Sequence, residues 1–145
     1  MIIRPMLISV ILAFSPAAVS YAKAPVVSTK EEGKLVRPLL YAFVDMNLKA
    51  FRNLVAEDFV PDKTGFLRQV SEALYKGKPL NLEFISGAVS NADGKSIVSF
   101  KWRKSVLDGA SRQMENKEGS AEFVFVNEKN IWLLFQINGD NPFTL

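Results

Sequence analysis

The sequence predicts an α+β domain in which helices come first and an antiparallel sheet follows. Apolar residues recur at steps of three and four over residues 35–55 and again over residues 64–74, which is the period of a helix packed on one face. From residue 80 onward the period changes to two, and short turn signals separate the alternating runs. Because helices and strands do not alternate along the chain, this order favours an α+β arrangement over a parallel α/β sheet.

The first helical region carries the best apolar stripe of the chain. Its members recur at three- and four-residue steps: Val36, Leu39, Leu40, Phe43, Val44, Leu48, Phe51, Leu54 and Val55. Asp45 and Asn47 interrupt the stripe, and Asn47 is of a type that caps the start of a helix. We therefore expect a bend or a break into two helices here. Pro61 ends the region, because a proline disfavours helix in the residue before it.

A second helix is expected over residues 64–74, with Asp62 or Thr64 as its N-cap. Its buried face consists of apolar residues at helical spacing: Phe66, Leu67, Val70, Ala73 and Leu74. Gly77 and Pro79 follow in the order in which helices tend to end.

The rest of the chain predicts strands joined by turns. Alternating runs begin at Leu80 and at Val98, and each has one buried face and one wet face. Residues 91–94 and 108–109 carry hairpin turn signals.

The later strands are less uniform in pattern. Residues 111–117 fit either an exposed strand or an extended hairpin arm, and residues 119–126 read as a strand. Residues 131–137 are apolar on both faces except for Gln136, which predicts a central strand covered on both sides.

Residues 1–22 have the features of a signal peptide for export. Arg4 supplies the positive end, residues 6–14 form a short apolar run, and small residues follow it. A membrane span needs about 20 apolar residues, so this run is too short for a stable membrane anchor. We expect cleavage after Ala22, although Ala22 and Ala24 also fit the small-x-small rule. The mature protein is then periplasmic or secreted.

The composition limits what the mature chain can be. There is no cysteine, so a lipid anchor on a cleaved N-terminal cysteine is excluded and no disulfide supports the core. Residues 23–33 are small, polar or charged and predict a flexible lead-in, followed by a single α+β domain over residues 34–145. The absence of histidine removes the commonest general base near neutral pH.

The charges do not indicate a nucleic-acid surface. The whole chain holds 18 basic and 15 acidic residues, which is a small excess. Its one basic concentration is Lys101, Arg103 and Lys104, which Trp102 interrupts. We interpret it as a solvated outer face of a strand and expect no nucleic-acid partner.

Several short motifs together resemble one known family. They are Asp45-Met46-Asn47-Leu48, Glu57-Asp58-Phe59, Phe100-x-Trp102, Gly119-x-Ala121-x-Phe123-x-Phe125, Trp132, and the run from Ile137 to Phe143. In this order they resemble the nuclear transport factor 2-like superfamily, a cystatin-like α+β cone, and in particular its bacterial exported members. The resemblance covers residues 35–143. It implies a strongly curved antiparallel sheet wrapped around the helices, a cone-shaped cavity, and a homodimer formed through the sheet.

The resemblance does not imply one activity, because the family contains both catalysts and binders. Its isomerase and dehydratase members use an acid or a histidine inside the cone, supported by tyrosine or aspartic acid donors. Asp45 is the acid of this chain best placed to approach the cavity, where burial would raise its pKa. The alternative is that Asp45 faces water and helps to end the first helix.

Aromatic residues are the candidates for an apolar ligand pocket: Tyr41, Phe84, Phe100, Trp102, Phe123 and Phe125. Trp132 is a further aromatic that could line such a pocket. A core without cysteine needs aromatics for packing as well, so each of them has core filling as its alternative role.

No cofactor or metal is expected. Glu57 and Asp58 are adjacent, so on a helix their side chains point about 100° apart and cannot chelate one ion together. Asp140 could offer a carboxylate to a cation, but a turn closing the last strand is the favoured reading.

Three functions remain open from the sequence. The favoured one is non-enzymatic binding of a small apolar ligand, or of a protein partner such as an envelope protein, through the cone or the sheet face. The first alternative is a small isomerase- or dehydratase-type enzyme that uses a cavity carboxylate. The second is an assembly or scaffold protein of the envelope.

Overall fold

A computed structural model describes residues 29–144, with side chains from residue 33 onward. The expected signal peptide over residues 1–22 lies outside this range. In chain order the elements are α2 Thr29–Val44, α3 Leu48–Asn53, α4 Lys63–Lys76, β1 Gly77–Ala92, β2 Lys95–Asp108, β3 Met114–Glu128 and β4 Ile131–Gly139. Helix α2 thus begins inside the segment 23–33, whose polar composition predicts a lead-in. Within the described residues no helix has the length and apolarity needed to cross a bilayer.

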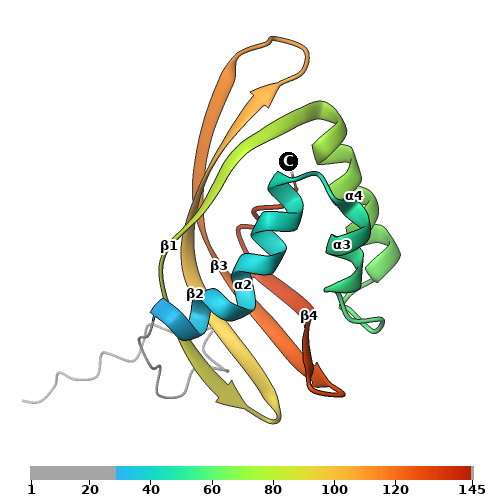
Figure 1. Cartoon of the computed structure of the whole chain (residues 1–145), viewed down its shortest axis with the longest axis vertical. Helices are drawn as coiled ribbons and strands as arrows, with labels where there is room; N and C mark the ends of the chain where they lie inside the picture. The colour runs from blue at the N-terminus through green and yellow to red at the C-terminus, as the bar shows by residue number, and fades with distance from the viewer. Residues whose placement is uncertain (1–28, 145) are drawn as a thin grey trace, which may run out of the picture.

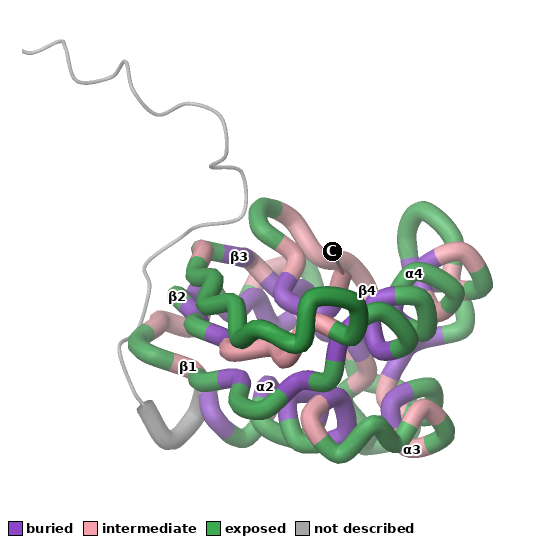
Figure 2. Tube along the Cα trace, turned by 90° about the horizontal axis from the view of Figure 1, so that it is seen from above, coloured by how far each residue is buried: buried purple, intermediate pink, exposed green. Residues whose placement is uncertain are grey.

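The strands form one antiparallel sheet in the order β1-β2-β3-β4, and the three helices lie on one face of it (Figure 1). The predicted α+β class is therefore confirmed. The buried positions in Figure 2 recur where helices and strands face each other. They form one continuous core that includes Leu39, Phe51, Val70, Phe123 and Leu134.

The predicted break between the first two helices is confirmed. Asn47 caps α3, and its side-chain Oδ1 accepts a hydrogen bond from the backbone N–H of Ala50 at 3.0 Å. Asp62 caps α4 in the same way, accepting from the backbone N–H of Gly65 at 2.8 Å. Both caps satisfy amide groups that the first helical turn leaves without a partner.

Irregularities in the strand register bend the sheet toward the helices. The β1–β2 register shifts between Pro79 and Asn81 and again between Phe84 and Ser86, and the β3–β4 register shifts beside Phe125. An extra residue on one strand increases local twist and bends that strand. The extra residue on β1 also explains why Leu80 is exposed, although the alternating pattern predicts it on the buried face.

The segment of uncertain type before residue 119 is an extended arm of the β2–β3 hairpin. Strand β3 already begins at Met114, and its residues up to Glu118 are exposed although they remain paired with β2. In Figure 1 this arm rises above the helices.

The prediction that residues 131–137 form a central strand is wrong, because β4 is the last strand of the sheet. Its outer edge is nevertheless covered by the segment between α3 and α4. The backbone N–H of Leu134 donates to the carbonyl of Leu54, and the Ala56 N–H donates to the carbonyl of Leu134, at 2.8 and 2.9 Å. The Val60 N–H donates to Phe135 O at 2.9 Å. Along β4 only Leu134 is fully buried, whereas Ile131 and Trp132 are exposed, so the expected burial of both faces is wrong as well.

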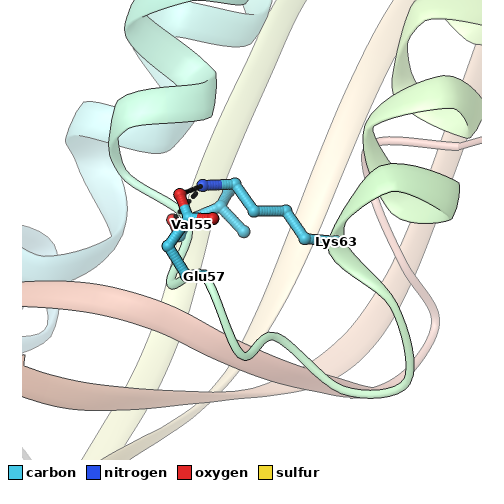
Figure 3. A network of polar contacts seen from close by, with 3 residues as sticks. All are labelled: Val55, Glu57 and Lys63. Atoms are coloured by element: carbon cyan, nitrogen blue, oxygen red, sulfur yellow. Dashed lines mark hydrogen bonds and ion pairs between the residues drawn. The ribbon is translucent and has the colours of Figure 1, made fainter.

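Lys63 fastens that covering segment to the start of α4 (Figure 3). Its ammonium group donates to the carbonyl of Val55 at 2.9 Å and to Glu57 Oε2 at 2.7 Å. The hydrogen bond and the positive charge of Lys63 lower the pKa of the Glu57 carboxyl. Glu57 and Asp58 are exposed, as expected of charges near a helix end.

We expect the Lys63→Gln variant to raise the pKa of Glu57 toward the usual value of a glutamate. The pKa of Glu57 is lower in the folded state than in the unfolded state, so its interaction with Lys63 stabilises the fold fully above the unfolded-state pKa. This stabilisation is lost as pH falls through the folded-state pKa. A carboxyl-detected NMR titration of Glu57 measures this shift. Lys76→Gln, at the other end of α4, is the matched control and leaves the titration unchanged.

Candidate ligand-binding site

A pocket of about 730 Å³ opens at one end of the cone. We call it the cone-mouth pocket. Its apolar wall consists of Leu35, Pro38, Leu39, Leu54, Val89, Phe125, Ile131 and Trp132. Its polar residues are Lys34, Asn91, Ser96 and Asn130. Both its size and its mainly apolar lining are those of small-molecule sites.

The topology of the sheet brings this lining together. In a sheet of sequential antiparallel strands, the first and third turns lie at the same end, so the β1–β2 and β3–β4 hairpins border one opening. The N-terminal half of α2 passes over the same end of the sheet (Figure 1). Asn91, Ser96 and Phe125 are direct cross-strand partners on β1, β2 and β3, so they form one row of the wall.

Ser96 is the most deeply placed polar side chain of the pocket. The alternation along β2 places it on the inner face with Val98 and Phe100, and it is only 4% exposed. Among the described residues the serine hydroxyls that form hydrogen bonds are those of Ser105 and Ser111, so the Ser96 hydroxyl has no partner there. Buried hydroxyl groups are nearly always paired with protein, water or ligand, so this group is available to a bound molecule.

The deeper part of the cone is filled by the C-terminal segment. Phe143 is fully buried, and its ring centroid lies 4.9 Å from that of Phe51, 5.3 Å from that of Phe43 and 5.6 Å from that of Phe123. The cavity that the resemblance implies is therefore confined to the mouth at this end of the helices.

Two inward side chains of β2 hold the C-terminal segment in place. Trp102 Nε1 donates to the carbonyl of Asp140 at 2.8 Å. Lys104 Nζ donates to the carbonyls of Pro142 and Thr144 at 2.8 and 3.2 Å. Asp140 itself accepts from the Ser120 N–H at 3.0 Å and donates its own N–H to Ser120 O. The expected turn at the end of the last strand is therefore confirmed.

The interpretation of Lys101, Arg103 and Lys104 as one solvated face is wrong for Lys104. Lys101 and Arg103 are exposed, whereas Lys104 is 4% exposed, because the period of two places residue 104 on the inner face with Trp102. The Lys104 ammonium lies 5.7 Å from the ring centre of Phe43 and 5.8 Å from that of Trp102. Burial, with a smaller contribution from the charge of Lys117, lowers its pKa from 10.5 to about 8.

A second, shallower hollow of about 710 Å³ lies on the sheet face opposite the helices. Small side chains line it, including Ser86, Ala88, Ser99 and Ser120. Asn138 crosses its rim and donates to Glu122 Oε1 at 3.0 Å. This outer hollow is more open than the cone-mouth pocket and offers less enclosure for a small molecule.

The structure places Asp45 and Tyr41 outside both hollows. Asp45 follows the last turn of α2 and is exposed, and Tyr41 is 62% exposed on the same helix. Neither residue lines the cone-mouth pocket or the outer hollow.

The other aromatic candidates lie close together, but mostly inside the core. Phe84 stacks on Phe100 with ring centroids 5.1 Å apart, and Phe100 meets Phe123 edge-on at 4.8 Å. Among the six candidates only Phe125 lines the cone-mouth pocket, while Phe100 borders the outer hollow. Trp102 serves as an anchor for the C-terminal segment.

Sequence reasoning missed most of the pocket lining. Asn91 and Asn130 carry turn signals only, whereas Trp132 is one of the aromatics that the sequence offers for a pocket. One signal in the sequence could have indicated this lining. If the four strands follow one another as an antiparallel meander, the first and third turns lie at the same end of the sheet.

No family model matches the sequence, and no curated protein matches it. Solved structures do match the fold. A nuclear transport factor 2-like superfamily protein from Salmonella enterica serovar Typhimurium is 13% identical, with a TM-score of 0.68, and the match covers 78% of this chain and 89% of that chain.

Two further matches have different descriptions. A candidate calcium/calmodulin-dependent protein kinase II association domain from Xanthomonas campestris is 16% identical, with a TM-score of 0.65, over 87% of this chain and 94% of the other. The β subunit of benzoate 1,2-dioxygenase from Burkholderia mallei is 9% identical, with a TM-score of 0.65, over 83% and 99%.

These matches define the class of the domain by its fold. The chain has the nuclear transport factor 2-like fold, as the resemblance in its sequence predicts. Proteins of this fold differ in role, as the dioxygenase subunit and the association domain illustrate, so the role must be argued from the site.

Proposed function

We propose that this protein binds a small, mainly apolar molecule in the cone-mouth pocket without transforming it. The observation that carries the proposal is the combination of about 730 Å³ of space, an apolar wall and the buried hydroxyl of Ser96 in the lining. Such a pocket gains affinity from apolar burial and orients its ligand through a few polar groups.

The polar residues of the pocket favour binding over acid–base catalysis. Within the described part of the chain they are one lysine, two asparagines and one serine, and no carboxylate lines the space. Asparagine and serine side chains form hydrogen bonds but do not titrate near neutral pH. A proton-transfer site would need an acid or base with a donor beside it.

The neutral dye N-phenyl-1-naphthylamine tests the proposal. We expect saturable binding of one dye per chain, with enhanced dye fluorescence and a change in Trp132 emission, because Trp132 lines the pocket and is 37% exposed without ligand. Ser96→Leu fills the pocket and weakens dye binding about tenfold or more, which corresponds to the loss of one good contact.

The matched control is Ser99→Leu, on the same strand but in the lining of the outer hollow. It leaves dye affinity unchanged if the cone-mouth pocket is the site. Asn91→Leu, at an exposed position of the same row, replaces Ser96→Leu if that variant fails to fold. Equal effects of the Ser96 and Ser99 substitutions, or no saturable binding, would contradict the proposal.

A further inference from the structure

The polar groups of the cone-mouth pocket lie among its apolar residues. Lys34 belongs to α2, while Asn91 and Ser96 pair across the β1–β2 hairpin. The fourth polar residue, Asn130, belongs to the turn of the other hairpin. Three of the four therefore come from α2 and the first hairpin.

These three side chains all offer hydrogen-bond donors. An ammonium group only donates, and amide and hydroxyl groups can donate to an acceptor that approaches them. No aspartate or glutamate lines the pocket within the described residues, so the one formal charge in the lining is that of Lys34. A wall of this kind favours a negatively charged group over a neutral or positive one.

Apolar residues make up the rest of the lining, and some of them come from α2 and β1 as well. Phe125, Leu54 and Trp132 come from β3, from the residue after α3 and from β4. A molecule in the pocket thus meets a few hydrogen-bond donors within a mainly aromatic and aliphatic surface.

We infer that the ligand is an amphiphile with a single carboxylate. Its carboxylate accepts hydrogen bonds from Lys34, Asn91 and the buried hydroxyl of Ser96, and its apolar chain packs against Phe125 and Trp132. This inference deepens the proposed function and rests on it.

Displacement of bound N-phenyl-1-naphthylamine by three probes of equal chain length tests the inference at neutral pH. The probes are decanoate, 1-decanol and decylamine, each below the concentration at which it aggregates. Decanoate is expected to displace the dye at about tenfold lower concentration than 1-decanol, because its carboxylate forms a charge-assisted hydrogen bond. Decylamine is expected to be the weakest of the three probes.

Lys34→Gln is expected to remove most of the preference for decanoate over 1-decanol, because it removes the positive charge of the lining. The matched control is Lys78→Gln, an exposed lysine at the other end of β1, which preserves the advantage. Ser96→Ala is expected to reduce the preference for decanoate over 1-decanol. Because alanine does not fill the pocket, this variant tests the hydroxyl group independently of the available space.

The outcomes separate the inference from the function on which it rests. If the dye binds but 1-decanol or decylamine displaces it as well as decanoate does, the inference is overturned and the binding function stands. The same holds if Lys34→Gln keeps the full preference for decanoate. If the dye does not bind at all, the proposed function fails and the inference fails with it.

Discussion

Replacing Phe143 by alanine is expected to lower the free energy of unfolding by about 3–4 kcal/mol. The ring is fully buried and contacts the rings of Phe43, Phe51 and Phe123, which come from α2, α3 and β3. Its removal leaves a cavity where three elements meet, and the surrounding side chains can relax only partly.

Urea unfolding followed by far-UV circular dichroism measures this change. Met114→Ala is the matched control, because Met114 is an exposed apolar residue on the β3 arm and its loss is expected to change stability by less than about 0.5 kcal/mol. A Phe143→Ala variant as stable as the control would show that the C-terminal segment does not contribute to the core.

The second large effect is a dependence of stability on pH that originates at Lys104. Its pKa is lowered from 10.5 to about 8 in the folded state, so between these pH values the unfolded chain keeps a proton that the folded chain has released. Stability therefore rises with pH in this window, by up to about 1.4 kcal/mol per pH unit. Well below pH 8 the group is protonated in both states and contributes no slope.

Lys104→Met isolates this contribution, because methionine fills similar space and carries no charge. The relevant quantity is the difference in the free energy of unfolding between wild type and variant, measured by urea unfolding from pH 7 to 10.5. We expect the wild type to gain stability relative to Lys104→Met across the upper part of the range. Lys101→Met, on the outer face of the same strand, is the control and shows no such difference.

The helices could be predicted closely because their signals are local. The stripe, the Asn47 cap and the Asp62 cap each depend on residues within one or two turns, and the structure confirms them. The resemblance predicts the curved sheet, and the matches to solved structures support that fold.

The errors concern features that depend on distant segments. The apolar pattern of β4 predicts burial on both faces, but β4 is the outermost strand, and its edge pairs with Leu54 and Ala56, about eighty residues earlier in the chain. Lys104 belongs to a basic run in the sequence, and its burial depends on the carbonyls of Pro142 and Thr144, almost forty residues away.

The candidate site was the least predictable part. Its lining comes from one helix, two hairpins and the residue after α3, so no short motif contains it. Aromatic type alone did not separate pocket from core, since Phe123 and Phe125 lie two residues apart on one strand and only Phe125 reaches the pocket.

The register shifts of β1 have a consequence for self-association. In the described part of the chain β1 is the other outermost strand, and no segment covers it as residues 54–60 cover β4. A regular, flat strand in this position would be a template for adding strands of neighbouring molecules. Pro79 lacks an N–H, Lys78 and Glu83 carry charge, and the two irregularities break the even spacing of free amides. The strand is therefore protected against uncontrolled growth of β-structure from one chain to the next.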